Sequence, residues 1–142
     1  MASAFSHRIE VRFRDCDLMG HVNNAVYFTY FEQARLVAAD TLGLRRSLEQ
    51  TGLGLILAHG SCDYKSQLKL GDAVDVRMSV AAVGRASFTL HYELVRVRDG
   101  TVVAIGKSVQ VIFDYEAGKS APIPDPLREK LEALITGSSI SS

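Results

Sequence analysis

The spacing of hydrophobic residues changes twice within the first forty positions. In segment 8–14 apolar and charged residues alternate, which predicts a half-buried strand. In segment 24–42 apolar residues recur every three or four positions, which predicts a long helix that is buried on most of its circumference. Asn23 or Asn24 can cap the start of this helix, and Gly43 is suited to end it.

The rest of the chain shows mainly the period of β-strands. The break at Arg98-Asp99-Gly100 is a strong hairpin signal, and segment 44–52 is polar enough for a short helical turn or loop. The predicted strands are 53–64, 73–83, 86–98 and 101–115, and a short amphipathic helix is predicted at 127–135.

This order of elements predicts an α+β fold. The strands after the long helix would form a meander, and the resulting antiparallel sheet would wrap around that helix. The length of 142 residues and the 47% of apolar residues suit one domain, at 1–135, followed by a flexible serine-rich tail at 136–142. The edges of such a sheet carry unpaired backbone N–H and C=O groups, and dimerisation with a second copy of the chain would cover them.

Charge and cysteine content narrow the class of partner. Sixteen basic residues balance sixteen acidic ones, so no global field favours nucleic acid or a membrane surface. Two cysteines do not make a disulfide framework, and with no signal peptide they indicate a cytoplasmic protein. No CxxC or HxxxH pair is present, so no metal site is expected.

The polar segment 15–24, between the first strand and the long helix, is the richest in chemical groups. It contains two carboxylates, one histidine and two asparagines. A carboxylate beside a helix start lies close to unpaired backbone N–H groups, a pairing that suits hydrolysis of an activated acyl group. Asp17 would otherwise cap a turn or the helix. Asp15 is expected to be structural, accepting backbone donors or pairing with Arg12, Arg14 or Arg35.

Two stretches carry a resemblance to a known family. The segment from Asp15 to Arg35 and the later Gly84-Arg85-Ala86-Ser87-Phe88 resemble the hot-dog fold acyl-CoA thioesterases of the 4-hydroxybenzoyl-CoA thioesterase type. The resemblance implies a sheet of about five strands around one long buried helix, plus a short C-terminal helix. It also implies a homodimer or homotetramer with active sites at the dimer interface.

The resemblance also implies site residues. Asp17 takes the position of the family's catalytic carboxylate, as nucleophile or as general base. Asn24 takes the position whose backbone N–H polarises the thioester carbonyl. Glu32 falls where some relatives carry a second acidic residue, although it could equally pair with Arg35. His21 could protonate the leaving thiolate, position Asp17 or bond across an interface.

Further residues are expected to bind substrate, each with an ordinary structural alternative. Asn23 is the more conventional helix cap, and the two aromatic residues are more often core. The basic residues could gather at the pocket mouth to meet the phosphates of coenzyme A. The substrate-binding candidates are Asn23, Tyr27, Phe31, Arg85, Ser87 and Lys65.

The sequence therefore predicts an acyl-CoA thioesterase that uses water, no cofactor and no metal. An acyl-carrier-protein thioesterase, which would release a fatty or polyketide chain, is the alternative enzyme. A non-catalytic acyl-CoA binding module is the alternative from another class. Neither nucleic acid nor a membrane is an expected partner.

Overall fold

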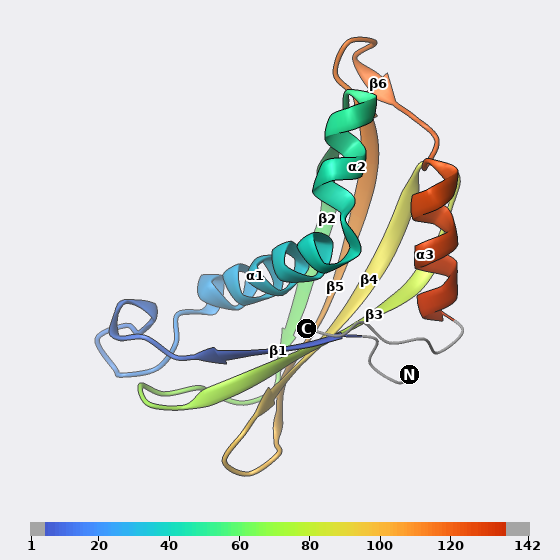
Figure 1. The fold of residues 1–142 in the computed structure, drawn as a ribbon. Coiled ribbons are helices and arrows are strands. Elements are labelled where there is room, and N and C mark those ends of the chain that lie inside the picture. The colour runs from blue at the N-terminus through green and yellow to red at the C-terminus, as the bar shows by residue number, and fades with distance from the viewer. Residues whose placement is uncertain (1–4, 136–142) are drawn as a thin grey trace.

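The computed structural model describes residues 5–135, in which one curled antiparallel sheet carries three α-helices (Figure 1). The predicted tail at 136–142 lies outside the described residues. The strand order is β1-β3-β4-β5-β2, and β6 pairs with β5. The strands are β1 (Phe5–Glu10), β2 (Leu53–Tyr64), β3 (Ala73–Val83), β4 (Ser87–Arg96), β5 (Val102–Asp114) and β6 (Lys119–Ser120).

Strand β2 departs from the predicted meander. It pairs with β5 rather than with its neighbour in sequence, β3. Tight turns join β3, β4 and β5, whereas segment 65–72 carries the chain from β2, at one edge of the sheet, across to β3, which lies next to the opposite edge strand β1. That segment is held on the way: the Lys65 N–H donates to the carbonyl oxygen of Val103, and Leu68 accepts from the N–H of Val22.

The long helix α1 (Asn24–Leu42) has the predicted bounds and caps. The side chain of Asn23 accepts a hydrogen bond from the Ala25 N–H at 2.9 Å. Gly43 ends the helix with a left-handed φ of 71° and is also the N-cap of α2 (Leu44–Thr51), so segment 44–51 is a helix rather than a loop. The terminal helix α3 (Asp125–Ile135) begins two residues before its predicted start. No helix within residues 5–135 is long and apolar enough to span a bilayer.

The core lies where α1 meets the inner face of the sheet. The ring of Phe31 stacks on that of Tyr92 with centroids 4.6 Å apart. Gly106, on the strand beside Tyr92, makes room for the Phe31 ring, because a Cβ at this position would collide with that ring. Ala34 and Ala38 are buried, and their small side chains allow the helix backbone to approach the sheet. The predicted sheet around a buried helix is therefore confirmed.

Candidate active site

Asp15 anchors the loop between β1 and α1. This residue is 2% exposed. Its carboxylate accepts hydrogen bonds from the Tyr30 hydroxyl at 2.8 Å and from Arg12, at its backbone N–H (3.0 Å) and at Nη2 (2.9 Å). Burial alone would raise the pKa of Asp15, but the bonds from Arg12 and Tyr30 outweigh it and hold the pKa below its usual value. The predicted structural role and pairing with Arg12 are confirmed.

Two residues further on, Asp17 closes a tight turn. Its Oδ1 accepts hydrogen bonds from the N–H groups of Met19 (2.9 Å) and His21 (3.3 Å), and its own N–H donates to the His21 carbonyl at 2.8 Å. Gly20 completes the turn with a φ of 77°. The other carboxylate oxygen, Oδ2, has no hydrogen-bond partner among residues 5–135. The turn thus fixes the carboxylate and leaves one oxygen available.

The start of α1 presents an available donor beside this turn. Asn23 accepts hydrogen bonds from the N–H groups of the second and third helical residues: its side chain accepts from Ala25 and its carbonyl oxygen accepts from Val26. The Asn24 N–H has no partner within the described part of the chain. The hydroxyl of Tyr64 donates to the Asn24 carbonyl at 2.8 Å and so fixes the first helical residue to the end of β2.

A cavity of about 300 Å³ joins these groups. Its walls include Asp17, His21, Asn24, Tyr27 and Lys65, which are five of the residues predicted from sequence. The Tyr27 side chain is buried, and its hydroxyl donates to the Ser66 carbonyl at 3.3 Å.

Four lining residues were not predicted, and they come from the loop before α1, from the end of β2 and from the segment after it. They are Val22, Tyr64, Ser66 and Gln67. Tyr64 packs edge-on against Tyr27 with ring centroids 5.0 Å apart. Its pairing with Asn24 spans forty positions and follows from the placement of β2, which no local sequence signal contains.

The other predicted site residues lie elsewhere in the chain. Phe31 packs in the core, and the side chain of Asn23 is used as the helix cap. Arg85 lies in the turn between β3 and β4, and Ser87 begins β4. The Arg85 carbonyl accepts a hydrogen bond from Arg128 of α3 at 3.1 Å. No group of His, Cys, Asp or Glu within residues 5–135 is arranged to hold a metal ion.

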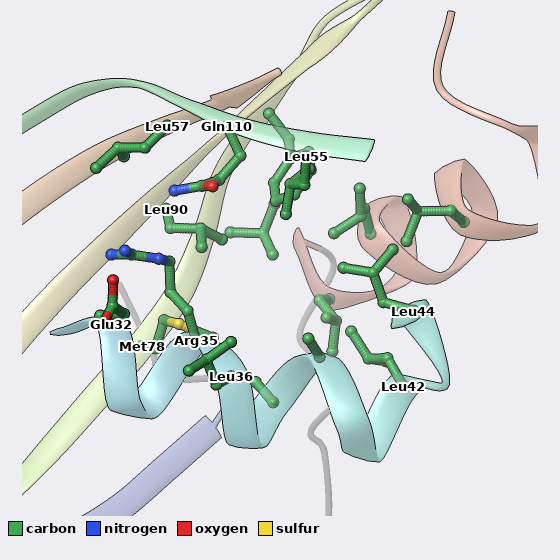
Figure 2. A pocket seen from close by; sticks show the side chains of 17 residues that line it. Glu32, Arg35, Leu36, Leu42, Leu44, Leu55, Leu57, Met78, Leu90 and Gln110 are labelled. Carbon is green, nitrogen blue, oxygen red and sulfur yellow. The ribbon is translucent and has the colours of Figure 1, made fainter. Parts of the chain in front are cut away.

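Glu32 lines a different, apolar cavity of about 460 Å³ between α1, α3 and the sheet (Figure 2). The alternative role of Glu32, an ion pair with Arg35, is not among the ion pairs within residues 5–135; the Arg35 guanidinium donates to the Tyr92 hydroxyl at 3.2 Å. In Figure 2 both side chains lie at one end of this cavity, and Leu42 and Leu44 lie at the other.

The site can support one kind of chemistry in particular. The exposed carboxylate of Asp17 is an acceptor for a proton or a nucleophile toward a carbonyl carbon. The Asn24 N–H, at the positive end of the α1 dipole, can stabilise a negative charge that develops on a carbonyl oxygen. One cavity therefore offers a group that can attack an acyl carbon and a hydrogen-bond donor for the oxygen of the same carbonyl.

Comparisons with known proteins agree with this chemistry. The model of the family described as "Thioesterase-like superfamily" matches residues 11–131. The chain is 32% identical to the protein YsmA of Bacillus subtilis over 90% of this chain and 85% of that protein. It is 27% identical to the acyl-CoA thioesterase YbgC of Haemophilus influenzae over 90% and 93%. A Thermus thermophilus thioesterase solved with coenzyme A and zinc is 32% identical, with a TM-score of 0.78 over 95% of this chain and 97% of that one.

Proposed function

Because this chain belongs to the thioesterase-like superfamily, we propose that it hydrolyses acyl-CoA thioesters to a free acid and coenzyme A. Membership of the family makes the chain a thioester hydrolase; the thiol, the acyl group and the roles of the residues are the proposal. A coenzyme A thioester is favoured over a carrier-protein thioester because the Thermus relative was solved with coenzyme A.

The observation that carries this proposal is the shared cavity of Asp17 and the Asn24 N–H. The carboxylate either takes a proton from water, which attacks the carbonyl carbon, or attacks that carbon itself and forms an anhydride that water then cleaves. In both routes the C–S bond breaks and coenzyme A leaves as a thiolate, which takes up a proton. The Asn24 N–H stabilises the oxyanion, a contribution of about 3 kcal/mol to the barrier for one such donor.

The remaining candidates have supporting parts in this proposal. His21 and Lys65 line the same cavity, where Lys65 supplies a positive charge for the phosphates of coenzyme A and His21 a donor for the thiolate. Tyr27 forms part of the wall on which the acyl group rests. Arg85 and Ser87 lie at the β3–β4 turn, so they would meet the coenzyme only where a second copy brings that turn to a neighbouring site.

We propose that the active form is a homodimer or homotetramer in the cytoplasm. Strand β2 ends the sheet, and no strand within residues 5–135 pairs with its outer edge. Apolar side chains are exposed along this edge and the helix beside it, with Leu57 at 50%, Leu36 at 52% and Phe28 at 39%. A second copy that pairs with β2 would cover both. Light scattering coupled to gel filtration gives the mass that decides between one, two and four chains.

The substitution Asp17→Asn tests the proposed chemistry. The amide oxygen can still accept the turn hydrogen bonds of Met19 and His21, while the nucleophile or base is lost. We expect kcat for acyl-CoA to fall by at least about 10³-fold with unchanged thermal stability and retained thioester binding. Glu116→Gln, in the exposed turn between β5 and β6, is the matched control and should keep full activity. Full turnover by Asp17→Asn would show that this carboxylate is not the catalytic group.

A pair of matched substrates tests the choice of thiol. We expect kcat/KM for an acyl-CoA to exceed that for the same acyl group on an acyl carrier protein. The reverse order would assign the chain to carrier-protein substrates.

A further inference from the structure

The apolar cavity between α1, α3 and the sheet is large and lined mostly by hydrocarbon. Its volume of about 460 Å³ lies within the range of small-molecule sites. The inner face of the sheet, the C-terminal half of α1 and the buried face of α3 form its walls, with leucines such as Leu42, Leu90 and Leu131 (Figure 2). Such a cavity suits an apolar ligand, because it offers few groups to which water can bond.

The cavity has few polar groups, and they are spread unevenly between its two ends. Glu32 and Arg35 lie at the end opposite Leu42 and Leu44 in Figure 2. The amide of Gln110 also faces the cavity; its nitrogen donates to the Ser108 hydroxyl at 3.3 Å. A ligand with a polar head and a long apolar tail matches this distribution, with the tail directed toward the leucines.

The cavity continues the line that begins at the proposed oxyanion donor. Asn24, Phe28, Arg35 and Ala39 are spaced so that they share one side of α1. A smaller cavity of about 150 Å³ includes Phe28 and shares Glu32, Arg35 and Leu57 with the large one. The cavity that contains Asn24 shares no lining residue with these two, so the helix alone sets the direction. A ligand that begins at Asn24 and follows this side of α1 would meet the small cavity first and the large cavity next.

The helix sets the length of ligand that reaches each part. Glu32 lies eight residues after Asn24, or about 12 Å along the axis, and Ala39 lies fifteen residues after it, or about 22 Å. An extended alkyl chain advances by about 1.3 Å per methylene, the projection of a C–C bond of about 1.5 Å. A chain with about nine methylenes therefore reaches the cavity, and one with about seventeen reaches Ala39. A benzoyl group would end at the helix start.

From this geometry we infer that the apolar cavity holds the distal part of a linear fatty-acyl chain of about ten carbons or more. The inference rests on the proposed function, since it places the thioester carbonyl at Asn24. It assigns the substrate class as long-chain aliphatic acyl-CoA, with the cavity between α1 and α3 as the site that measures chain length.

Ala39 offers a direct test, because it lines the cavity and a larger side chain there would fill its far part. The wild-type kcat/KM should rise at least tenfold from octanoyl-CoA to palmitoyl-CoA; full burial would give about fourfold for each added methylene. Ala39→Phe should lower kcat/KM at least tenfold for palmitoyl-CoA and less than twofold for octanoyl-CoA. Ala39→Leu, a smaller change that is easier to accommodate, should lie between Ala39→Phe and the wild type.

Thr41→Phe is the matched control. Thr41 lies on the same helix, is exposed and does not line this cavity. Thr41→Phe should change kcat/KM for octanoyl-CoA and for palmitoyl-CoA by less than twofold. The inference is overturned if the wild type cleaves benzoyl-CoA or acetyl-CoA as efficiently as palmitoyl-CoA, or if Ala39→Phe lowers the octanoyl and palmitoyl rates equally.

Calorimetric titration with palmitate, below its micelle concentration, separates this inference from the proposed function. Wild-type protein should bind palmitate, and Ala39→Phe should weaken the affinity at least tenfold. Binding of this kind without hydrolysis of any acyl-CoA would overturn the proposed function and keep the chain-length site. Hydrolysis with no dependence on chain length would overturn the chain-length site and leave the proposed function in place.

Discussion

The hydroxyl of Tyr30 donates a 2.8 Å hydrogen bond to Oδ2 of Asp15, and this bond fastens the loop that carries Asp17 to helix α1. Both side chains are buried. Burial and the neighbouring Asp15 carboxylate raise the pKa of Tyr30, so the phenol stays protonated and remains a donor. The loop also bonds to the helix start, because the Asn23 N–H donates to the Asp15 carbonyl at 3.0 Å. Asp15 therefore positions the proposed catalytic turn without contacting its cavity.

Tyr30→Phe should lower both stability and turnover. It removes a hydrogen bond to a buried carboxylate, which typically costs about 1.5–3 kcal/mol. Since Arg12 is then the only donor to the Asp15 carboxylate within residues 5–135, we expect kcat to fall more than the affinity for substrate. Urea unfolding and steady-state kinetics measure the two effects. Unchanged stability would show that the bond between these two residues contributes little.

Acid should destabilise the fold through two buried carboxylates, Asp15 and Asp72. Burial raises the pKa of Asp72, but hydrogen bonds from the Lys69 N–H (3.0 Å) and the Arg98 guanidinium (2.8 Å) bring it below its usual value, as happens at Asp15. A depressed folded-state pKa gives stability that is present above the unfolded-state pKa of about 3.9 and is lost as the pH falls below it.

The urea midpoint should therefore fall as the pH is lowered from 5 to 3. Asp15→Asn and Asp72→Asn should each flatten this dependence, because each removes a buried group that takes up a proton on unfolding. A midpoint that stays constant over this range in the wild type would contradict the assignment.

Asn24→Pro should remove the proposed oxyanion donor while preserving the helix. Proline is favoured at the first helical position, and the preceding Asn23 has a φ of −61° and a ψ of 137°, which suit a residue before proline. We expect kcat to fall by about 10²–10³ with little change in melting temperature. Asn24→Ala keeps the backbone N–H and should retain most of the activity. Equal rates for the two variants would exclude this N–H from the chemistry.

Gly106→Ala should be destabilising by about 1–3 kcal/mol, because its Cβ would overlap the Phe31 ring where that ring stacks on Tyr92. Gly60→Ala is the matched control in a strand: its Cβ would meet the Phe28 ring at 3.7 Å, an ordinary contact. Urea unfolding should separate the two variants clearly. Similar stabilities would show that the core yields around Phe31 at little cost.

The sequence was sufficient for the local structure and insufficient for part of the tertiary structure. The period of segment 24–42 and its caps at Asn23 and Gly43 predicted α1 to the residue, because both signals are local. The placement of β2 beside β5 was missed, since it depends on how segment 65–72 is held by distant backbone groups.

The same distinction applies to the candidate site. Asp17, His21 and Asn24 are close in sequence, and the structure brings them together in one cavity. Tyr64 reaches that cavity from forty positions away, so it could not be predicted. Glu32 is on the predicted helix, but its surroundings are set by α3 and the sheet, and it lines the apolar cavity instead. The catalytic and binding roles themselves stay predictions.

The position of β2 has a consequence for how the chain acquires its structure. Strands β3, β4 and β5 form two consecutive hairpins, whose local contacts can form early. Strand β2 can pair only after β5 is in place, and β5 begins 38 residues after β2 ends. Until then the apolar stretch Leu53-Gly54-Leu55-Ile56-Leu57 has no sheet partner. A chain caught at this stage is prone to join another through the same stretch. We therefore expect the refolding yield to fall as protein concentration rises, and polar substitution at the exposed Leu57 to restore part of it.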